Sequence, residues 1–201
     1  MPCVIVVVAA LKGGVGKTTT AVYLAAVAGG GKHSVTLVDS DPQASAADWV
    51  EHGADEVFES IDVVEAPTER LLVKTLERIE GDDVAVVDTP PGHERLLAKA
   101  LERADAVVIP TRVGGVETAR VEAVLDMVPK RLPAGLVFSS ARTFTRDYQE
   151  TVAMWHEAGV PVWGTIPERV GIAAGPDGWL SAEGLELYGD VLRRARRATR
   201  S

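Results

Sequence analysis

Short apolar runs alternate with amphipathic stretches along the chain. The apolar runs are continuous, which is typical of strands in a parallel sheet that is buried on both faces. We therefore expect strands at residues 4–9, 35–39, 61–64, 84–88, 106–110, 136–139 and 162–166. Apolar residues at helical spacing predict helices at residues 17–28, 44–52, 69–80, 94–103, 116–128, 146–158 and 181–198.

This alternation of strands and helices predicts a doubly wound α/β fold, with a mostly parallel sheet and helices on both faces. Ligands of such sheets bind at the carboxyl ends of the strands. The polar residues that directly follow each apolar run are therefore the candidates for function.

A glycine-rich segment with two lysines joins the first predicted strand to the first predicted helix. It reads Leu11-Lys12-Gly13-Gly14-Val15-Gly16-Lys17-Thr18-Thr19. In this context glycines let backbone N–H groups surround a phosphate, and the helix N-terminus adds partial positive charge. Lys17 can reach the β- and γ-phosphates, and the Thr18 hydroxyl can bind Mg²⁺. An ordinary glycine-rich turn fits less well, and the G-x-G-x-x-G pattern of a dinucleotide site does not occur.

Carboxylates follow the second and the fourth predicted strands. Asp39 ends the second strand and Asp41 follows two residues later, while Asp88 ends the fourth, before Thr89-Pro90-Pro91-Gly92. Beside a bound triphosphate such carboxylates indicate metal binding and positioning of water. Two alternatives stay open: Asp41 can cap the next helix, with Pro42 in its first turn, and Asp88 can simply start a turn.

The second lysine of the glycine-rich segment, Lys12, gives the pattern K-G-G-x-G-K-T-T. This segment resembles the deviant Walker A box of the ParA/MinD family of P-loop ATPases. The segments D-S-D-P-Q (39–43) and D-T-P-P-G (88–92) resemble two further motifs of that family. The resemblance extends over nearly the whole chain and is to the small ParA ATPases. It implies a single P-loop ATPase domain over residues 1–201, without the N-terminal helix-turn-helix domain of larger ParA proteins.

The resemblance also implies roles for individual residues in ATP hydrolysis. Lys17 neutralises charge on the transferred phosphoryl group, Asp41 orients the attacking water, and Lys12 reaches the phosphates of a partner subunit across a dimer interface. Thr18, Asp39 and Asp88 serve Mg²⁺. The nucleotide-binding loop comprises Lys12, Gly13, Gly14, Val15, Gly16, Lys17, Thr18 and Thr19. The switch segment comprises Asp88, Thr89, Pro90, Pro91 and Gly92.

The part of the site that would bind the adenine is implied by less specific sequence motifs than the phosphate-binding loop. The segment around Pro167 and Arg169 resembles the family's loop near the adenine, although a plain turn explains Pro167 equally well. Ser139 stands where family members often carry an asparagine that contacts the base.

The expected function is that of a partition or positioning ATPase with ATP and Mg²⁺ as cofactors. ATP binding favours a homodimer that binds DNA without sequence preference, and a small ParB-like adaptor stimulates hydrolysis. The cargo is a plasmid, a chromosome or a protein assembly, and the protein is cytoplasmic and nucleoid-associated. Two rivals are a MinD-like ATPase that cycles on a membrane and an ATP-dependent synthetase. The first needs bulky apolar residues on a C-terminal helix, and the second needs longer loops after the strands.

Charge is unevenly distributed along the chain. The net charge is −8, yet the last eleven residues carry five arginines and no acid, so the rest carries −13. These are Arg193, Arg194, Arg196, Arg197 and Arg200, candidate contacts to the DNA backbone. They can also simply complement the dipole of a helix C-terminus. The chain has one cysteine, typical of a reducing compartment, and no apolar stretch of the ~18 residues of a membrane span.

Overall fold

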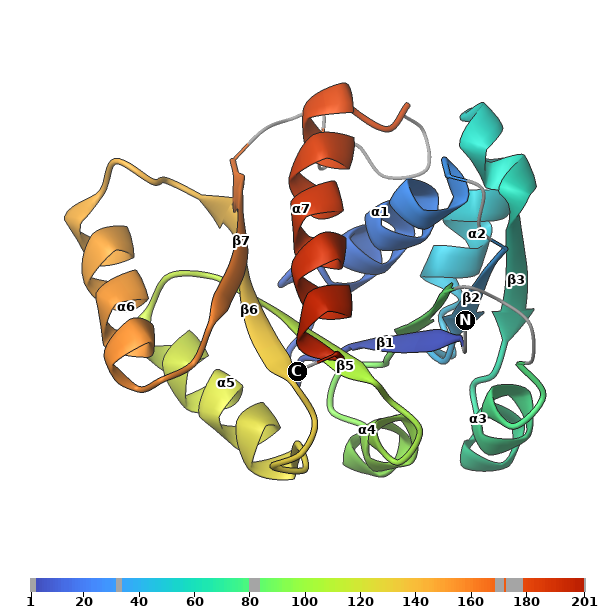
Figure 1. Cartoon of the computed structure of the whole chain (residues 1–201), viewed down its shortest axis with the longest axis horizontal. Helices are drawn as coiled ribbons and strands as arrows, with labels where there is room; N and C mark the ends of the chain where they lie inside the picture. Colours follow the sequence, from blue (N-terminus) through green and yellow to red (C-terminus); the bar gives the residue numbers. More distant parts are fainter. Residues whose placement is uncertain (1–2, 32–33, 80–83, 169–171, 173–178, 201) are drawn as a thin grey trace.

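The computed structural model describes residues 3–31, 34–79, 84–168, 172 and 179–200. Strands and helices alternate in this part of the chain, as Figure 1 shows. The strands are β1 (Val4–Val8), β2 (Val35–Asp39), β3 (Ile61–Glu65), β4 (Val84–Asp88), β5 (Ala106–Thr111), β6 (Ala134–Ala141) and β7 (Val162–Pro167). The helices are α1 (Lys17–Gly29), α2 (Ser45–His52), α3 (Glu69–Leu76), α4 (Glu94–Leu101), α5 (Gly115–Met127), α6 (Arg146–Glu157) and α7 (Ala182–Ala198). A 3₁₀ helix, η1 (Glu56–Ser60), precedes β3.

The strands form one seven-stranded sheet in the order β3-β2-β4-β1-β5-β6-β7, with all pairings parallel. This confirms the predicted doubly wound α/β fold. Because the sheet is parallel, the carboxyl ends of its strands lie along one edge, where the polar residues that follow them can meet.

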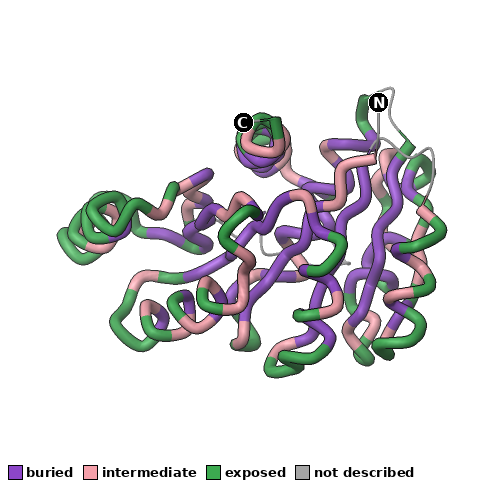
Figure 2. The backbone as a smooth tube through the Cα atoms, turned by 60° about the horizontal axis from the view of Figure 1, so that its bottom comes forward, coloured by how far each residue is buried: buried purple, intermediate pink, exposed green. Residues whose placement is uncertain are grey.

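The sheet is covered on both faces. One core packs α1, α2 and α7 against it, and a second core packs α3, α4, α5 and α6 against the opposite face. Side chains of β1 alternate between these cores, with Val6 and Val8 in the first and Val7 in the second. Figure 2 shows the resulting pattern of buried strands inside and exposed outer helix faces. Burial on both faces explains why the strands are continuously apolar.

Helix α3 and strand β6 differ most from their predicted bounds. Helix α3 ends at Leu76 and not at residue 80, because the Arg78 N–H bonds to the Thr75 carbonyl and closes a tight turn there. Strand β6 begins earlier and ends later than predicted, and its pairing with β7 shifts between Phe138 and Ala141. Ser140 lies at that irregularity with a φ of 49°. The shift turns the end of β6 at the edge where the candidate site lies.

Among the described residues, no helix is long and apolar enough to cross a membrane. The same part of the chain contains no cluster of three or more His, Cys, Asp or Glu side chains arranged to hold a metal.

Candidate nucleotide-binding site

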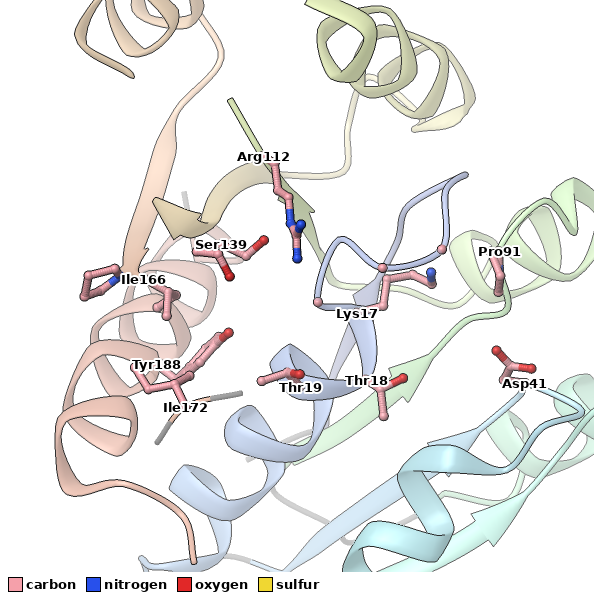
Figure 3. A pocket seen from close by; sticks show the side chains of 15 residues that line it. Lys17, Thr18, Thr19, Asp41, Pro91, Arg112, Ser139, Ile166, Ile172 and Tyr188 are labelled. Atoms are coloured by element: carbon pink, nitrogen blue, oxygen red, sulfur yellow. The ribbon is translucent and has the colours of Figure 1, made fainter. Parts of the chain in front are cut away.

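A cavity of about 340 Å³ opens at the carboxyl edge of the sheet, and Figure 3 shows the side chains that line it. Its volume is in the range of small-molecule sites. One end is formed by the loop between β1 and α1, together with Asp41 and Pro91. The other end is largely apolar and is formed by Ile166, Pro167, Ile172 and Tyr188, with Ser139 and Ser140 between. A ligand with one charged end and one flat apolar end fits this division.

The loop between β1 and α1 has a backbone that favours glycine. Gly14 and Gly16 adopt φ angles of 76° and 89°, which L side chains rarely adopt, and Gly16 directly precedes α1. The buried Ser139 hydroxyl joins this loop to the end of β5, because it donates to the Val15 carbonyl at 2.7 Å and lies 3.1 Å from the Thr111 carbonyl. Helix α1 therefore points its unpaired N-terminal amides at the cavity, as in an anion site.

Lys17 is the cation at the charged end of the cavity. Its buried ammonium donates to the Lys12 carbonyl at 3.0 Å. Burial lowers the pKa of Lys17, while the carboxylates of Asp88 and Asp41 act in the opposite direction. The geometry places this charge where a phosphate bound by the loop would lie.

Asp88 is the carboxylate whose environment best fits a metal. It is buried, the Thr18 side chain lies near enough to influence its pKa, and its Oδ1 atom has no hydrogen-bond partner among the described residues. Burial raises the pKa of Asp88 to about 7, and the hydrogen bond from Thr18 opposes the shift. A buried carboxylate with an unsatisfied oxygen beside a threonine hydroxyl is the donor set that Mg²⁺ takes in P-loop sites. Thr18 and Asp88 therefore fit the metal role expected of them.

The two carboxylates after β2 have different surroundings. Asp39 is buried; its Oδ1 accepts the Asp41 N–H, and its Oδ2 accepts the N–H groups of Ala46 and Ala47 at 2.8 and 3.0 Å. Burial raises the pKa of Asp39, although these backbone bonds oppose the shift. This departs from the metal role expected for Asp39, since both oxygens already hold the turn and the start of α2.

Asp41 is not the cap of the following helix. The residue before α2 is Ala44, with a φ of 51°, and Asp41 accepts the Gln43 N–H, at 3.0 Å, in a local turn. Its carboxylate lines the cavity near Pro91. Capping therefore does not explain Asp41, and its place is compatible with positioning water.

The segment that we expect to act as a switch, residues 88–92, lies beside the charged end. The buried Thr89 hydroxyl donates to the Val8 carbonyl at 2.8 Å, and the Ser40 hydroxyl donates to the Asp88 carbonyl at 2.6 Å. Pro91 lines the cavity, and Gly92 adopts a φ of 70°. Hydrogen bonds therefore hold the segment at Asp88 and Thr89, before Pro90, and the backbone adopts a left-handed conformation at Gly92.

Lys12 forms an ion pair within its own chain. Its ammonium lies 2.6 Å from Oε1 of Glu117, on α5, and the same oxygen accepts Arg120 at 3.0 Å. The Lys12 side chain is 44% exposed and that of Glu117 is 12% exposed. Lys12 is thus held at the surface of this protomer, and nothing in the motif indicates its partner Glu117.

Two further residues of the cavity lie outside every recognisable motif and were not predicted from the sequence. Arg112 lines it from the end of β5, and Tyr188 from α7, with the Tyr188 hydroxyl 3.3 Å from that of Thr20. Burial raises the pKa of Tyr188 well above its usual range. Of the two residues expected near the base, Pro167 lines the apolar end, whereas Arg169 lies outside the described residues.

The five arginines of α7 and its end lie together around one hollow, which Asp190 also lines. Arg193 pairs with Asp190, and Arg194 donates to the Val162 carbonyl at 3.4 Å. Val191 and Leu192 point instead into the core, where both are buried. The exposed side of this half-helix is therefore basic rather than apolar.

Comparison with known proteins agrees with this geometry. Residues 6–178 match the family described as the CobQ/CobB/MinD/ParA nucleotide binding domain. The chain is 46% identical over 101 residues to the Maintenance of carboxysome distribution protein A of Gloeobacter kilaueensis, a match that covers 50% of this chain and 45% of that protein. It is 31% identical over 155 residues to Protein ParA of Rhizobium radiobacter, covering 73% of this chain and 69% of that one.

The fold is also that of a putative plasmid partition protein from Borrelia burgdorferi B31, solved with bound AMPPNP. The TM-score is 0.78 at 22% identity, over 94% of this chain and 97% of the other. At this identity the likeness extends to the fold alone.

Proposed function

Since this chain belongs to the CobQ/CobB/MinD/ParA nucleotide-binding family, we propose that it is a positioning ATPase of the small ParA type. The observation that carries the proposal is the charged end of the cavity. Lys17, Thr18 and Asp41 line it, and the buried Asp88 lies near enough to influence the pKa of Lys17. Two of its relatives are named for carboxysome distribution and ParA, which supports positioning as the task.

In the proposed reaction ATP and water give ADP and phosphate. The amides at the start of α1 and the Lys17 ammonium hold the phosphates and neutralise charge on the transferred group. Asp41 orients the attacking water. Thr18 and Asp88 would hold Mg²⁺, which supplies further positive charge to the phosphates when bound. Ser139 keeps the loop in place through its bond to Val15.

ATP acts in this proposal as the ligand that favours a dimer. Lys12 leaves Glu117 and binds the partner's phosphates, so hydrolysis is coupled to assembly as with an arginine finger. The dimer binds DNA without sequence preference through the arginine face, which comprises Arg193, Arg194, Arg196, Arg197 and Arg200 at the end of α7. The second subunit supplies a second copy of this face. A small ParB-like adaptor stimulates hydrolysis and so releases the DNA.

The arginine face favours DNA over a membrane as the surface on which the ATPase cycles. A membrane helix needs exposed bulky apolar side chains. Val191 and Leu192 are the bulky apolar residues nearest the arginines on α7, and both are buried.

The proposal is tested by ATP binding and phosphate release in the parent and in Lys17→Ala. We expect Lys17→Ala to weaken ATP binding at least ~10-fold, because the phosphates lose a charge-assisted partner. Lys99→Ala, which removes an exposed lysine paired with Glu102, is the matched control and should bind as the parent does. Unchanged ATP affinity in Lys17→Ala would exclude this loop as the phosphate site.

A further inference from the structure

Arg112 places a second positive charge in the cavity. It directly follows β5, and Figure 3 shows its side chain pointing into the opening beside Ser139. Its guanidinium has no hydrogen bond or ion pair with any described residue. Arg112 contributes to lowering the pKa of Glu168, but that carboxylate is already paired with Arg142 at 2.7 Å. A long cationic side chain directed into a cavity without a protein partner indicates a ligand.

The position of Arg112 defines which part of a ligand it can meet. Lys17 and Asp41 lie on one side of the loop, and Arg112 lies on the other side, toward Ser139 and Ile166. It is therefore between the phosphate cradle and the apolar end of the cavity. In a nucleotide, the groups between the terminal phosphate and the base are the α- and β-phosphates and the ribose.

The chemistry of arginine selects the phosphates among these groups. A guanidinium presents a planar set of donors that binds two phosphate oxygens at once, and it keeps its charge at any physiological pH. Around the charged end, Asp41 and Asp88 face the single ammonium of Lys17. Arg112 adds a second positive charge to the lining of the cavity that a polyanion would enter.

We propose that Arg112 is a nucleotide-binding residue whose guanidinium binds the α- and β-phosphates of the nucleotide in its own subunit. The proposal rests on the proposed function, because it takes a nucleotide as the ligand. It differs from the role of Lys12, which serves the partner. Since ADP and AMPPNP share these two phosphates, Arg112 contributes equally to both.

The test is a titration of ADP and of AMPPNP, in the presence of Mg²⁺, against the parent and four variants. These are Arg112→Ala, Arg112→Lys, Arg142→Ala and Lys17→Ala. We expect Arg112→Ala to raise the Kd of both nucleotides by the same factor of ~10 or more, and Arg112→Lys to raise it less, because charge remains but the two-oxygen contact is lost. Arg142 is a matched control, since it lies on the neighbouring strand end and pairs with Glu168 outside the cavity lining.

Each outcome has one meaning. An Arg112→Ala affinity within twofold of the parent overturns the proposal, and so does a loss confined to AMPPNP, which would place Arg112 at the γ-phosphate. If Lys17→Ala also binds as the parent does, the proposed function fails as well. If Lys17→Ala loses binding while Arg112→Ala keeps it, only the role of Arg112 is rejected. Melting of each nucleotide-free variant checks its folding, and Arg112→Lys carries the test if Arg112→Ala unfolds.

Discussion

Replacing Lys12 by alanine removes a contact between two distant parts of the chain. The Lys12 ammonium lies 2.6 Å from a Glu117 side chain that is 12% exposed. A hydrogen bond to a charged group contributes about 1.5–3 kcal/mol. We expect a smaller effect, about 1 kcal/mol in the free energy of unfolding, because Lys12 is nearly half exposed and Arg120 stays on the same oxygen. For a chain of this size that lowers the melting temperature by about 2–4 °C.

Urea unfolding of the nucleotide-free protein measures this effect. A double-mutant cycle of Lys12→Ala and Glu117→Gln isolates the pair, with an expected coupling of about 1 kcal/mol. The exposed Lys99–Glu102 pair is the matched control and should show a smaller coupling. A coupling of zero between Lys12 and Glu117 would mean that the contact is not made in solution.

The same variants test whether Lys12 serves a partner subunit. We expect Lys12→Ala to bind ATP but to show no ATP-dependent increase in mass by light scattering. Glu117→Gln should form the dimer at lower ATP concentration, because Lys12 no longer has to leave a buried carboxylate. An increase in mass of Lys12→Ala equal to that of the parent would refute the reasoning.

Three further predictions concern the loop, the metal site and the arginine face. Gly16→Ala should destabilise the protein by about 1–2 kcal/mol and weaken ATP binding, since its φ is 89°; parent-like urea unfolding would contradict this. Asp88→Asn should stabilise the nucleotide- and Mg²⁺-free protein at pH 8, by at most about 4 kcal/mol, but not at pH 4. Because the pKa of Asp88 is raised to about 7 in the folded protein, the parent loses stability as pH rises from about 4 to about 7, where the unfolded chain ionises while the folded protein keeps the proton. Equal melting shifts at both pH values would contradict it. Arg196→Ala with Arg197→Ala should weaken ATP-dependent DNA retention and flatten its salt dependence, whereas Arg103→Ala should not; retention equal to the parent's across a salt titration would place the DNA surface elsewhere.

The fold could be predicted because its signal is local. Continuously apolar runs such as residues 84–87 are buried on both faces of the sheet, and the glycines of the loop mark a backbone that other residues rarely adopt. Strand order β3-β2-β4-β1-β5-β6-β7 places the strand ends at one edge, as parallel pairing requires. The extra length of β6 was not visible, because Ala134 and Gly135 give no strong strand signal.

The site could be predicted only in part, because neighbouring carboxylates look alike in sequence. The spacing of Asp39 and Asp41 does not show which one faces the cavity; the fold directs Asp39 to the start of α2. Glu117 and Arg112 were missed for another reason. Glu117 meets Lys12 across 105 positions in the chain, and Arg112 follows a strand without a recognisable motif.

The central claim is that ATP binding at this site drives assembly and that Asp41 is needed for hydrolysis. The most direct test is light scattering of Asp41→Ala with ATP and Mg²⁺, with phosphate release followed in parallel. Because Asp41 lines the cavity but caps no helix, its loss should leave ATP binding intact and stop hydrolysis. We expect a persistent species of about twice the 21.3 kDa chain mass. A protein that binds ATP and stays monomeric, or that releases phosphate at the parent rate, would contradict the account.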